Sequence, residues 1–432
     1  MEKPRGTKES EFESVLKLIN QIFRINRGYE STMEQEFPLL LTRSNADNMR
    51  IIKEDGKPVS CVNFVERNIL IDGNEILTAS IGAVCTNEKY RGKGYSSLLL
   101  EDVEKKMYED GVDLALVSGT RALYQRRGYT LTKNFIKYEI YPEKVDLNFQ
   151  IEEFKEDNLL DIARLYNTAS TRFVRPMEDF KKLIKSALFP WGNVSYKSYV
   201  IKENTVITGY VFIRILNDTD KIGIVVEAMG RNDYIEEGLK IIAYLNNLKF
   251  IEYKIHIADR SNFQKDVYHK GLGYQAGSVK IINFESFMEK LRPYFRQYVE
   301  AELINKIQFK SIENKPKCEK QNIKVYEEVK DNYLEEDKIN ISEQANKGLN
   351  GFKFNVTEEI LNHIEVIESK AVYRVVFEEE VLEIKDIRTL NKLIFEGGSD
   401  LELNYSGKKK LKGFIEAVFP VPFVYAANLN YQ

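Results

Sequence analysis

The sequence predicts an α+β protein built from two tandem copies of one mixed-sheet unit and a third domain after them. The chain has 432 residues, more than a single domain usually holds. Paired strands, a central strand, a helix and a further strand follow one another from residue 49 to 129, and the same order recurs from residue 195 to 284. We therefore expect domains at residues 1–145, 146–286 and 287–432.

The composition limits the classes of function. A formal net charge of -3 provides no general attraction to nucleic acid or to an anionic membrane, so we expect no nucleic-acid partner. No apolar run reaches the roughly 18 residues that indicate a membrane span. The three cysteines lack the spacing of a metal or redox motif. A cytoplasmic protein without a metal is the simplest interpretation.

The first copy begins with a helix at residues 11–23, where apolar side chains recur at helical spacing. Tight turns at Asp55-Gly56 and Asp72-Gly73 predict two strand pairs. The last strand is long and apolar, which is typical of a central strand covered on both faces. A helix and a short strand follow. The predicted strands lie at residues 49–53, 58–65, 68–71, 75–86 and 114–118, and the helix at residues 96–107.

A glycine-rich basic turn separates the long strand from this helix. It reads Tyr90-Arg91-Gly92-Lys93-Gly94-Tyr95-Ser96. A helix start leaves N–H groups unpaired, and glycines allow a phosphate to approach them. The turn lacks the Gly-Lys-Ser/Thr ending of a P-loop, and no acidic ribose-binding residue follows it. It predicts a pyrophosphate site, with an ordinary turn as the alternative.

This turn resembles the Arg-x-x-Gly-x-Gly/Ala signature of the GCN5-related N-acetyltransferases (GNAT), with Ser96 where the family usually has glycine or alanine. The segment Leu123-Tyr124-Gln125-Arg126-Arg127-Gly128-Tyr129 resembles the family's Tyr-x-x-x-Gly-Phe/Tyr ending. The resemblance implies that Tyr124 is the general acid for a departing thiolate. It also implies acetyl-CoA as the cofactor, bound by Val84, Thr86, Arg91, Gly92, Lys93, Gly94, Tyr95 and Ser96.

The role of Tyr124 is chemically reasonable. A thiol has a pKa of roughly 8.5, whereas a phenol has a pKa of about 10. The phenol therefore stays protonated at neutral pH and can donate its proton to the thiolate.

The second copy keeps the order of elements but lacks the basic turn. At that position stands Gly230-Arg231-Asn232-Asp233-Tyr234, where Asp233 would repel a phosphate. If Gly273-Tyr274 is aligned with Gly128-Tyr129, His269 takes the place of Tyr124. We therefore expect a degenerate GNAT-like domain without a cofactor.

The layout as a whole resembles the Eis-like (enhanced intracellular survival) branch of the superfamily. That branch has an active domain, a degenerate copy and a sterol-carrier-protein-like C-terminal domain. The third domain matches by its Phe-x-x-x-Leu-x-Pro-Tyr start at residues 287–294 and its Phe-Pro-x-Pro segment at residues 419–422. The resemblance implies that the terminal carboxylate of Gln432 enters the active site and holds or deprotonates the amine. It also implies a hexamer.

These features predict an acetyl-CoA-dependent N-acetyltransferase that acts by direct transfer to a primary amine. No histidine precedes residue 256, so the amine would lose its proton to a carboxylate such as Glu30, Glu34 or Glu36, to a water chain or to the terminal carboxylate. The same three glutamates would attract a polycationic substrate. By resemblance, the amine belongs to an aminoglycoside- or polyamine-like molecule or to a lysine side chain. The alternative is a non-catalytic protein that binds acyl-CoA or an apolar ligand.

Overall fold

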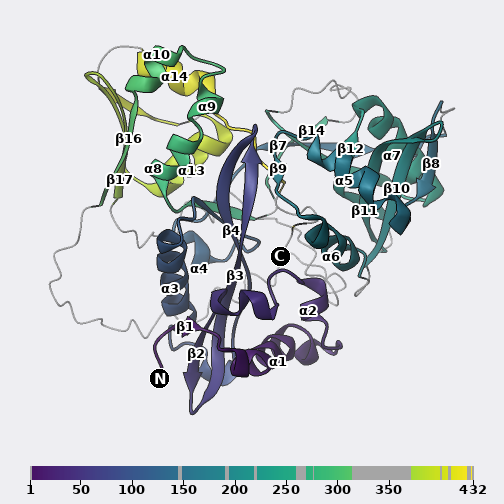
Figure 1. Ribbon diagram of the computed structural model, residues 1–432, viewed down its shortest axis with the longest axis horizontal. Coiled ribbons are helices and arrows are strands. Elements are labelled where there is room, and N and C mark those ends of the chain that lie inside the picture. The colour runs from purple at the N-terminus through teal and green to yellow at the C-terminus, as the bar shows by residue number, and fades with distance from the viewer. Residues whose placement is uncertain are drawn as a thin grey trace.

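The structure is a computed structural model and describes residues 2–144, 148–189, 194–217, 221–258, 269–275, 277–313, 371–398, 401–406, 410–425 and 430. Within these residues the chain forms three sheets with their helices, seen as three lobes in Figure 1. Parallel and antiparallel pairs both occur, which confirms the prediction of mixed sheets. Among the described helices, none has both the length and the apolar character needed to cross a membrane.

The first sheet has the order β1-β2-β3-β4-β5-β15-β6, and β9 pairs with β3. The strands predicted at residues 58–65 and 68–71 are one strand, β3, because Glu66 and Arg67 between them also pair with β4. β4 runs antiparallel to β3 and parallel to β5. The bounds are β1 Arg5–Gly6, β2 Met49–Glu54, β3 Lys57–Ile71, β4 Asn74–Thr86, β5 Leu114–Val117, β6 Thr130–Leu131, β9 Arg172–Phe173 and β15 Ser278–Ile281.

Helices cover both faces of this sheet. On one face, α3 packs Leu99 and Val103 against Phe64 and Ile81. On the other face, α1 packs around Cys61 and its neighbours, and helices of the third lobe cover the rest. The helices are α1 Phe12–Phe23, α2 Met33–Glu36, α3 Tyr95–Glu109 and α4 Ala122–Gln125, with 3₁₀ turns at Glu9–Glu11, Ile25–Arg27, Arg43–Asn48 and Glu88–Tyr90.

The second sheet has the order β14-β7-β13-β12-β11-β10-β8. Its helices α5, α6 and α7 match the helical patterns of the second copy. The bounds are β7 Phe135–Ile140, β8 Gln150–Glu153, β10 Val194–Glu203, β11 Val206–Leu216, β12 Ile222–Gly230, β13 Phe250–His256, β14 His269–Gly273, α5 Leu159–Asn167, α6 Met177–Ala187 and α7 Asn232–Leu245, with a 3₁₀ turn at Glu156–Asn158.

The two sheets exchange strands. β7 follows the first-sheet strand β6 along the chain but lies in the second sheet, between β14 and β13. β15 follows the second-sheet strand β14 but lies in the first sheet, between β5 and β6. The last strand of the second copy therefore pairs with the first. The division at residues 145 and 286 remains a prediction, and the sheets themselves extend across it.

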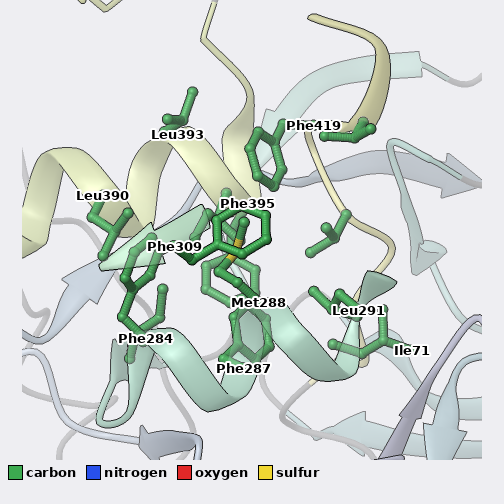
Figure 2. Close-up of a cluster of buried hydrophobic side chains, with 14 of the residues drawn as sticks. Ile71, Phe284, Phe287, Met288, Leu291, Phe309, Leu390, Leu393, Phe395 and Phe419 are labelled. Carbon is green, nitrogen blue, oxygen red and sulfur yellow. The ribbon is translucent and has the colours of Figure 1, made fainter. Parts of the chain in front are cut away.

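The third sheet has the order β16-β17-β18-β19 and is antiparallel. Figure 2 shows its core, in which Phe287, Leu291, Phe395 and Phe419 gather beside Ile71 of β3. The first and third lobes thus share one buried cluster. The bounds are β16 Gln308–Glu313, β17 Ala371–Phe377, β18 Glu380–Ile384, β19 Asn404–Ser406, α8 Phe284–Lys290, α9 Arg292–Phe295, α10 Ala301–Lys306, α13 Ile387–Glu396 and α14 Lys410–Val418. The sterol-carrier-like character of this lobe remains a prediction.

A buried ion pair joins the second lobe to the C-terminal segment. The Arg175 guanidinium donates to both carboxylate oxygens of Glu227, at 2.9 and 2.6 Å, and the Tyr210 hydroxyl donates to the same carboxylate at 2.8 Å. Arg175 also donates to the side-chain oxygen of Asn430. The side chains of Arg175 and Glu227 are 0% and 4% exposed. The pair therefore holds the chain two residues before its last residue.

We predict that removing one partner of this pair destabilises the protein strongly. Glu227→Leu leaves the Arg175 charge buried without its carboxylate, and we expect a loss of about 3–5 kcal/mol in the free energy of unfolding. Replacing both residues together, Arg175→Met with Glu227→Leu, is expected to restore most of that loss. Urea denaturation measures both values.

The matched control is the exposed pair of Arg231 and Asp233 in the same lobe, whose side chains are 54% and 60% exposed. Asp233→Asn is expected to cost less than about 1 kcal/mol. Equal losses for Glu227→Leu and Asp233→Asn would contradict the prediction.

Candidate functional site

A β-bulge interrupts β4 near its carboxyl end. The register against β3 shifts between Cys61 and Asn63, and Ala83 and Val84 lie at this point. Ala83 has a φ of +48°, a left-handed conformation that costs a residue with a Cβ about 1–2 kcal/mol. The side-chain amide of Asn63 donates to the Ala83 carbonyl oxygen at 2.9 Å. This hydrogen bond stabilises the bulge.

The bulge lies where β4 and β5 separate. Their parallel pairing ends at Ile81 and Val117, whereas β4 continues to Thr86. Residues 82–86 of β4 and residues 118–121 after β5 therefore border an opening between the two strands, the β4–β5 opening. Because the bulge adds a residue, Ala83 packs toward the α1 cluster and Val84 toward the α3 cluster.

The glycine-rich turn adjoins this opening. Gly92 and Gly94 have φ values of +78° and +75°, and a Cβ on either would meet nothing within 4 Å. In the described part of the chain, the N–H groups of Gly92, Lys93 and Gly94 have no hydrogen-bond partner. The Arg91 side chain is 60% exposed. Open N–H groups, a helix start and exposed positive charge together suit a phosphate.

Three hydroxyl groups connect the turn to the sheet. Ser96 Oγ lies 2.9 Å from Thr86 Oγ1, which lies 2.8 Å from Ser60 Oγ. Ser60 in turn donates to the Cys85 carbonyl oxygen at 3.1 Å. The serine that departs from the GNAT signature thus fixes the first turn of α3 to β4 and β3.

Tyr95 has a structural role in the same turn. Its side chain is buried, and its hydroxyl donates to the Glu54 carboxylate. This hydrogen bond raises the pKa of Tyr95 to about 12. The contact ties the start of α3 to β2.

Tyr124 lies in α4 beside the β4–β5 opening. Its side chain is 5% exposed, and its ring packs on Gly119, where a Cβ would come within 2.5 Å of Tyr124 Cε2. Burial raises the pKa of Tyr124 above the ordinary value of 10, although the charge of Arg121 acts in the opposite direction. Tyr124 is therefore a protonated donor throughout the neutral range.

The three predicted glutamates differ in their surroundings. Glu30 is exposed, and Glu34 is half-buried and accepts from the Asn20 amide at 3.0 Å. Glu36 forms a buried ion pair with Arg24 and also accepts from the Thr32 hydroxyl at 2.6 Å. Because these contacts already occupy its carboxylate, Glu36 has little freedom to bind an amine. Gln432, the other predicted group, lies outside the described residues.

His256 and the cysteine pair are buried. Burial lowers the pKa of His256 to about 3, so its imidazole is neutral at physiological pH. His256 Nδ1 accepts from the Ala258 amide at 3.0 Å, which leaves the proton on Nε2.

Cys61 and Cys85 lie 3.4 Å apart at their sulfur atoms, and this contact and burial raise the pKa of the Cys85 thiol. Cys85 is therefore suited to packing rather than to nucleophilic attack.

The second copy has a different contact at the position of the basic turn. Arg231 donates to the Asp233 carboxylate at 2.7 Å and lies over the Tyr234 ring, 4.0 Å from its centroid. An acidic side chain thus stands in the first turn of α7, where a phosphate would be repelled.

Comparisons with known proteins agree with this geometry. Residues 3–132 match the family model described as an acetyltransferase (GNAT) domain. The match covers less than a third of the chain and includes the bulge, the glycine-rich turn and Tyr124. The prediction of an acyltransferase is confirmed by this match. The GNAT family uses acetyl-CoA.

Three solved structures are similar to this chain. A GCN5-related N-acetyltransferase from Anabaena variabilis is 13% identical over 98% of both chains, with a TM-score of 0.59. A conserved protein from Enterococcus faecalis, described as a probable N-acyltransferase, is 15% identical over 67% of this chain and 74% of its own, with a TM-score of 0.51. Eis1 from Mycobacterium abscessus is 15% identical over 66% and 75%, with a TM-score of 0.46. At these identities the likeness concerns the fold. Among curated proteins, none matches the chain in sequence.

The residues that match the GNAT model contain features that the sequence did not reveal. Asn63 and Ala83 form the bulge, but neither residue belongs to a recognised motif. Ser278 of β15 lies between β5 and β6 and donates to the Gly119 carbonyl oxygen at 3.3 Å. An unusually long central strand was the one available signal for a bulge. No local signal identifies the partner of an exchanged strand.

We predict that the buried neutral state of His256 makes stability fall at acidic pH. The folded pKa of about 3 lies below the ordinary value of 6.5, so unfolded chains bind the extra proton first. The contribution to stability is complete above about pH 6.5 and is lost as the pH falls toward 3. His256→Asn keeps an acceptor for the Ala258 amide and removes this titration.

The measurement is the melting temperature at pH 7 and at pH 4.5 for the wild type and for His256→Asn. We expect the wild type to lose more than the variant over this interval. Equal losses would show that His256 gains its proton as readily in the folded protein as in the unfolded chain.

Proposed function

We propose that this protein is an N-acetyltransferase that moves the acetyl group of acetyl-CoA directly to a primary amine. One observation carries the proposal. The bulge at Ala83, the open N–H groups of the glycine-rich turn and the protonated Tyr124 border the same β4–β5 opening. Acetyl-CoA bound there would have its phosphates at the glycine-rich turn and its thioester sulfur near the Tyr124 phenol.

The binding roles follow from the geometry of the turn. The N–H groups of Gly92, Lys93 and Gly94 would bind the pyrophosphate, and Arg91 would add a mobile positive charge. Val84 and Thr86 would lie along the pantetheine arm, since β4 continues past the end of β5 at this point. Backbone N–H groups of the separated strand would polarise the thioester carbonyl. Tyr95 and Ser96 would hold the turn in place.

In the proposed transfer, the amine nitrogen forms a bond to the acetyl carbon as the carbon–sulfur bond breaks. Tyr124 donates its hydroxyl proton to the departing sulfur. The proton lost by the amine passes to a carboxylate or to water and finally restores Tyr124. Glu30 and Glu34 keep more freedom than Glu36 for the carboxylate role, and the terminal carboxylate of Gln432 remains a further proposal.

The proposal also includes the more specific features that the resemblance to the Eis-like branch implies. It comprises the Eis-like layout, the sterol-carrier-like third domain, a hexameric assembly, a cytoplasmic location, and an aminoglycoside, polyamine or lysine acceptor. The alternative function is binding of acyl-CoA without catalysis. Thiol release from acetyl-CoA, measured with a panel of amines, distinguishes catalysis from binding alone. Only a transferase releases coenzyme A at a rate that depends on the amine.

We predict that Tyr124→Phe lowers kcat by about 100-fold or more, because a positioned proton donor contributes about 10²–10⁴ in rate. The KM for acetyl-CoA is expected to stay within about twofold, since the ring is retained. Thiol release monitored with a chromogenic disulfide measures both constants.

The matched control is Tyr129→Phe. Tyr129 is buried beside Tyr124, with ring centroids 6.1 Å apart, and it has no place in the proposed transfer. Its kcat is expected to remain near that of the wild type. A normal kcat for Tyr124→Phe would remove the general-acid role.

We predict that Gly94→Ala raises the KM for acetyl-CoA by about tenfold or more. A Cβ at a φ of +75° strains the turn, and it also narrows the approach of a phosphate to the N–H groups. Gly73→Ala introduces the same strain at a φ of +81° in the β3–β4 turn.

Gly73→Ala is the control variant, and we expect it to lose stability but to keep the wild-type KM for acetyl-CoA. Steady-state kinetics at varied acetyl-CoA concentration separate the two effects. Equal changes in KM for both variants would mean that strain, and not phosphate binding, explains the result.

A further inference from the structure

The helix that carries Tyr124 is too short to hold its own position. α4 has four residues, Ala122–Gln125, whereas an isolated helix needs about 12–15 residues to be stable in water. Its place beside the β4–β5 opening therefore comes from contacts with other parts of the chain. Because a misplacement of about 1 Å can cost a reaction about 100-fold in rate, those contacts bear on the proposed proton transfer.

One set of contacts lies within the first lobe. The Gln125 side chain donates from Nε2 to the Thr120 carbonyl oxygen at 2.9 Å. Arg127, which follows α4, donates to both carboxylate oxygens of Glu104 in α3, at 3.0 and 2.8 Å. The first lobe thus holds the loops on either side of α4.

A second set of contacts comes from α13 of the third lobe. Arg388 Nη2 donates to the Gln125 carbonyl oxygen at 3.0 Å, at the last residue of α4. The same carbonyl oxygen accepts from the Gly128 amide at 2.9 Å. A carbonyl oxygen has two lone pairs, so Arg388 supplies the second hydrogen bond of this group. The third lobe is therefore joined to the backbone of α4 itself.

α13 also contacts the turn that follows α4. Asn391 Nδ2 donates to the Gly128 carbonyl oxygen at 3.1 Å. A Cβ on Gly128 would clash with Ile387 Cγ2, so the turn and α13 are in direct contact. Ile387, Arg388 and Asn391 lie on one side of α13, because residues four apart share a helix face. This face of α13 supports the segment from the end of α4 to Gly128.

The position of the Tyr124 phenol depends on this backbone. Its ring packs on Gly119 and lies edge-on to Tyr129, with ring centroids 6.1 Å apart. In the described part of the chain, no hydrogen bond holds the Tyr124 hydroxyl. The ring contacts and the backbone of α4 therefore place the hydroxyl group, and a shift of α4 would move it.

We propose that Arg388 is a positioning residue for the acetyl transfer and acts through the α4 backbone on the Tyr124 phenol. This inference rests on the proposed acetyl transfer. It gives the third lobe a part in placing the proton donor, and this part requires no ligand in that lobe. A contact that only joined the lobes would change the stability of the protein but not the rate of the transfer step.

The test begins with Arg388→Met, which keeps an unbranched apolar side chain but removes the donor. Thiol release gives kcat and the KM for acetyl-CoA. We expect kcat to fall by about tenfold, because α4 loses one of its fixed points. The KM is expected to stay within about twofold, since the glycine-rich turn is unchanged. Arg388→Lys keeps a charged donor for this single hydrogen bond and is expected to recover most of the lost kcat.

A second background shows whether Arg388 acts through Tyr124. Arg388→Met is combined with Tyr124→Phe, which lacks the proton that Arg388 would position. The double variant is expected to have the kcat of Tyr124→Phe alone, because residues that act as a unit have non-additive effects. A general loss of structure would instead lower kcat by the same factor in both backgrounds.

The matched control is Arg374→Met in the same lobe. Arg374 of β17 donates to the Glu383 carboxylate of β18 at 3.0 and 2.8 Å, and its side chain is 41% exposed. This contact lies within the third sheet, so the control is expected to keep the wild-type kcat. Hydrogen exchange of the amides of residues 126–129 adds a measurement that does not depend on turnover. It is expected to be faster in Arg388→Met and unchanged in Arg374→Met.

Two outcomes would overturn the positioning role. One is a wild-type kcat in Arg388→Met, and the other is an equal loss of kcat with and without the Tyr124 hydroxyl. Failure of the proposed function has a different signature, because the wild type itself would then show no amine-dependent thiol release. That result would overturn the positioning role together with the transfer, even where faster amide exchange shows that α13 holds α4.

Discussion

The site depends on one backbone constraint, the left-handed conformation of Ala83 in β4. This residue shifts the register against β3 and turns Val84 and Thr86 toward α3. Beyond it, β4 still pairs with β3 but no longer with β5, so its backbone groups on the β5 side face the opening. The Asn63 side chain compensates the strain by binding the Ala83 carbonyl oxygen. The bulge at the end of β4 therefore rests on local strain that one buried side-chain amide stabilises.

The exchange of strands brings a strand of the second copy to the sheet that carries Tyr124. With β15 inserted between β5 and β6, the edge beside Tyr124 contains residues from both copies. The two lobes also share a core, since Met33 of α2 and Phe180 of α6 belong to one buried cluster, and these helices face each other between the lobes (Figure 1). The second copy, which has no basic turn, thus contributes a strand to the sheet of the first.

The sequence was sufficient to predict most elements and the cofactor side of the site. Periodicity and turn residues located α1, β4, α3 and the second-copy helices, and the spacing of Arg91, Gly92, Gly94 and Tyr124 was enough to indicate the GNAT domain. Strand partners could not be predicted, because alternation shows that a strand is half-buried but not which sheet it joins. The pairing of Glu36 with Arg24 was missed for a related reason. The sequence does not show whether a charged side chain is buried or exposed.

The electrostatics around Tyr124 bear on which amine can be accepted. Glu36 is neutralised by Arg24, so the carboxylates that would attract a polycation are reduced to Glu30 and Glu34. The charge of Arg121 opposes the burial that raises the pKa of Tyr124, and burial together with Arg24 and Arg121 lowers the pKa of Arg27. Positive charge thus accumulates near the phenol and would repel a substrate with many ammonium groups.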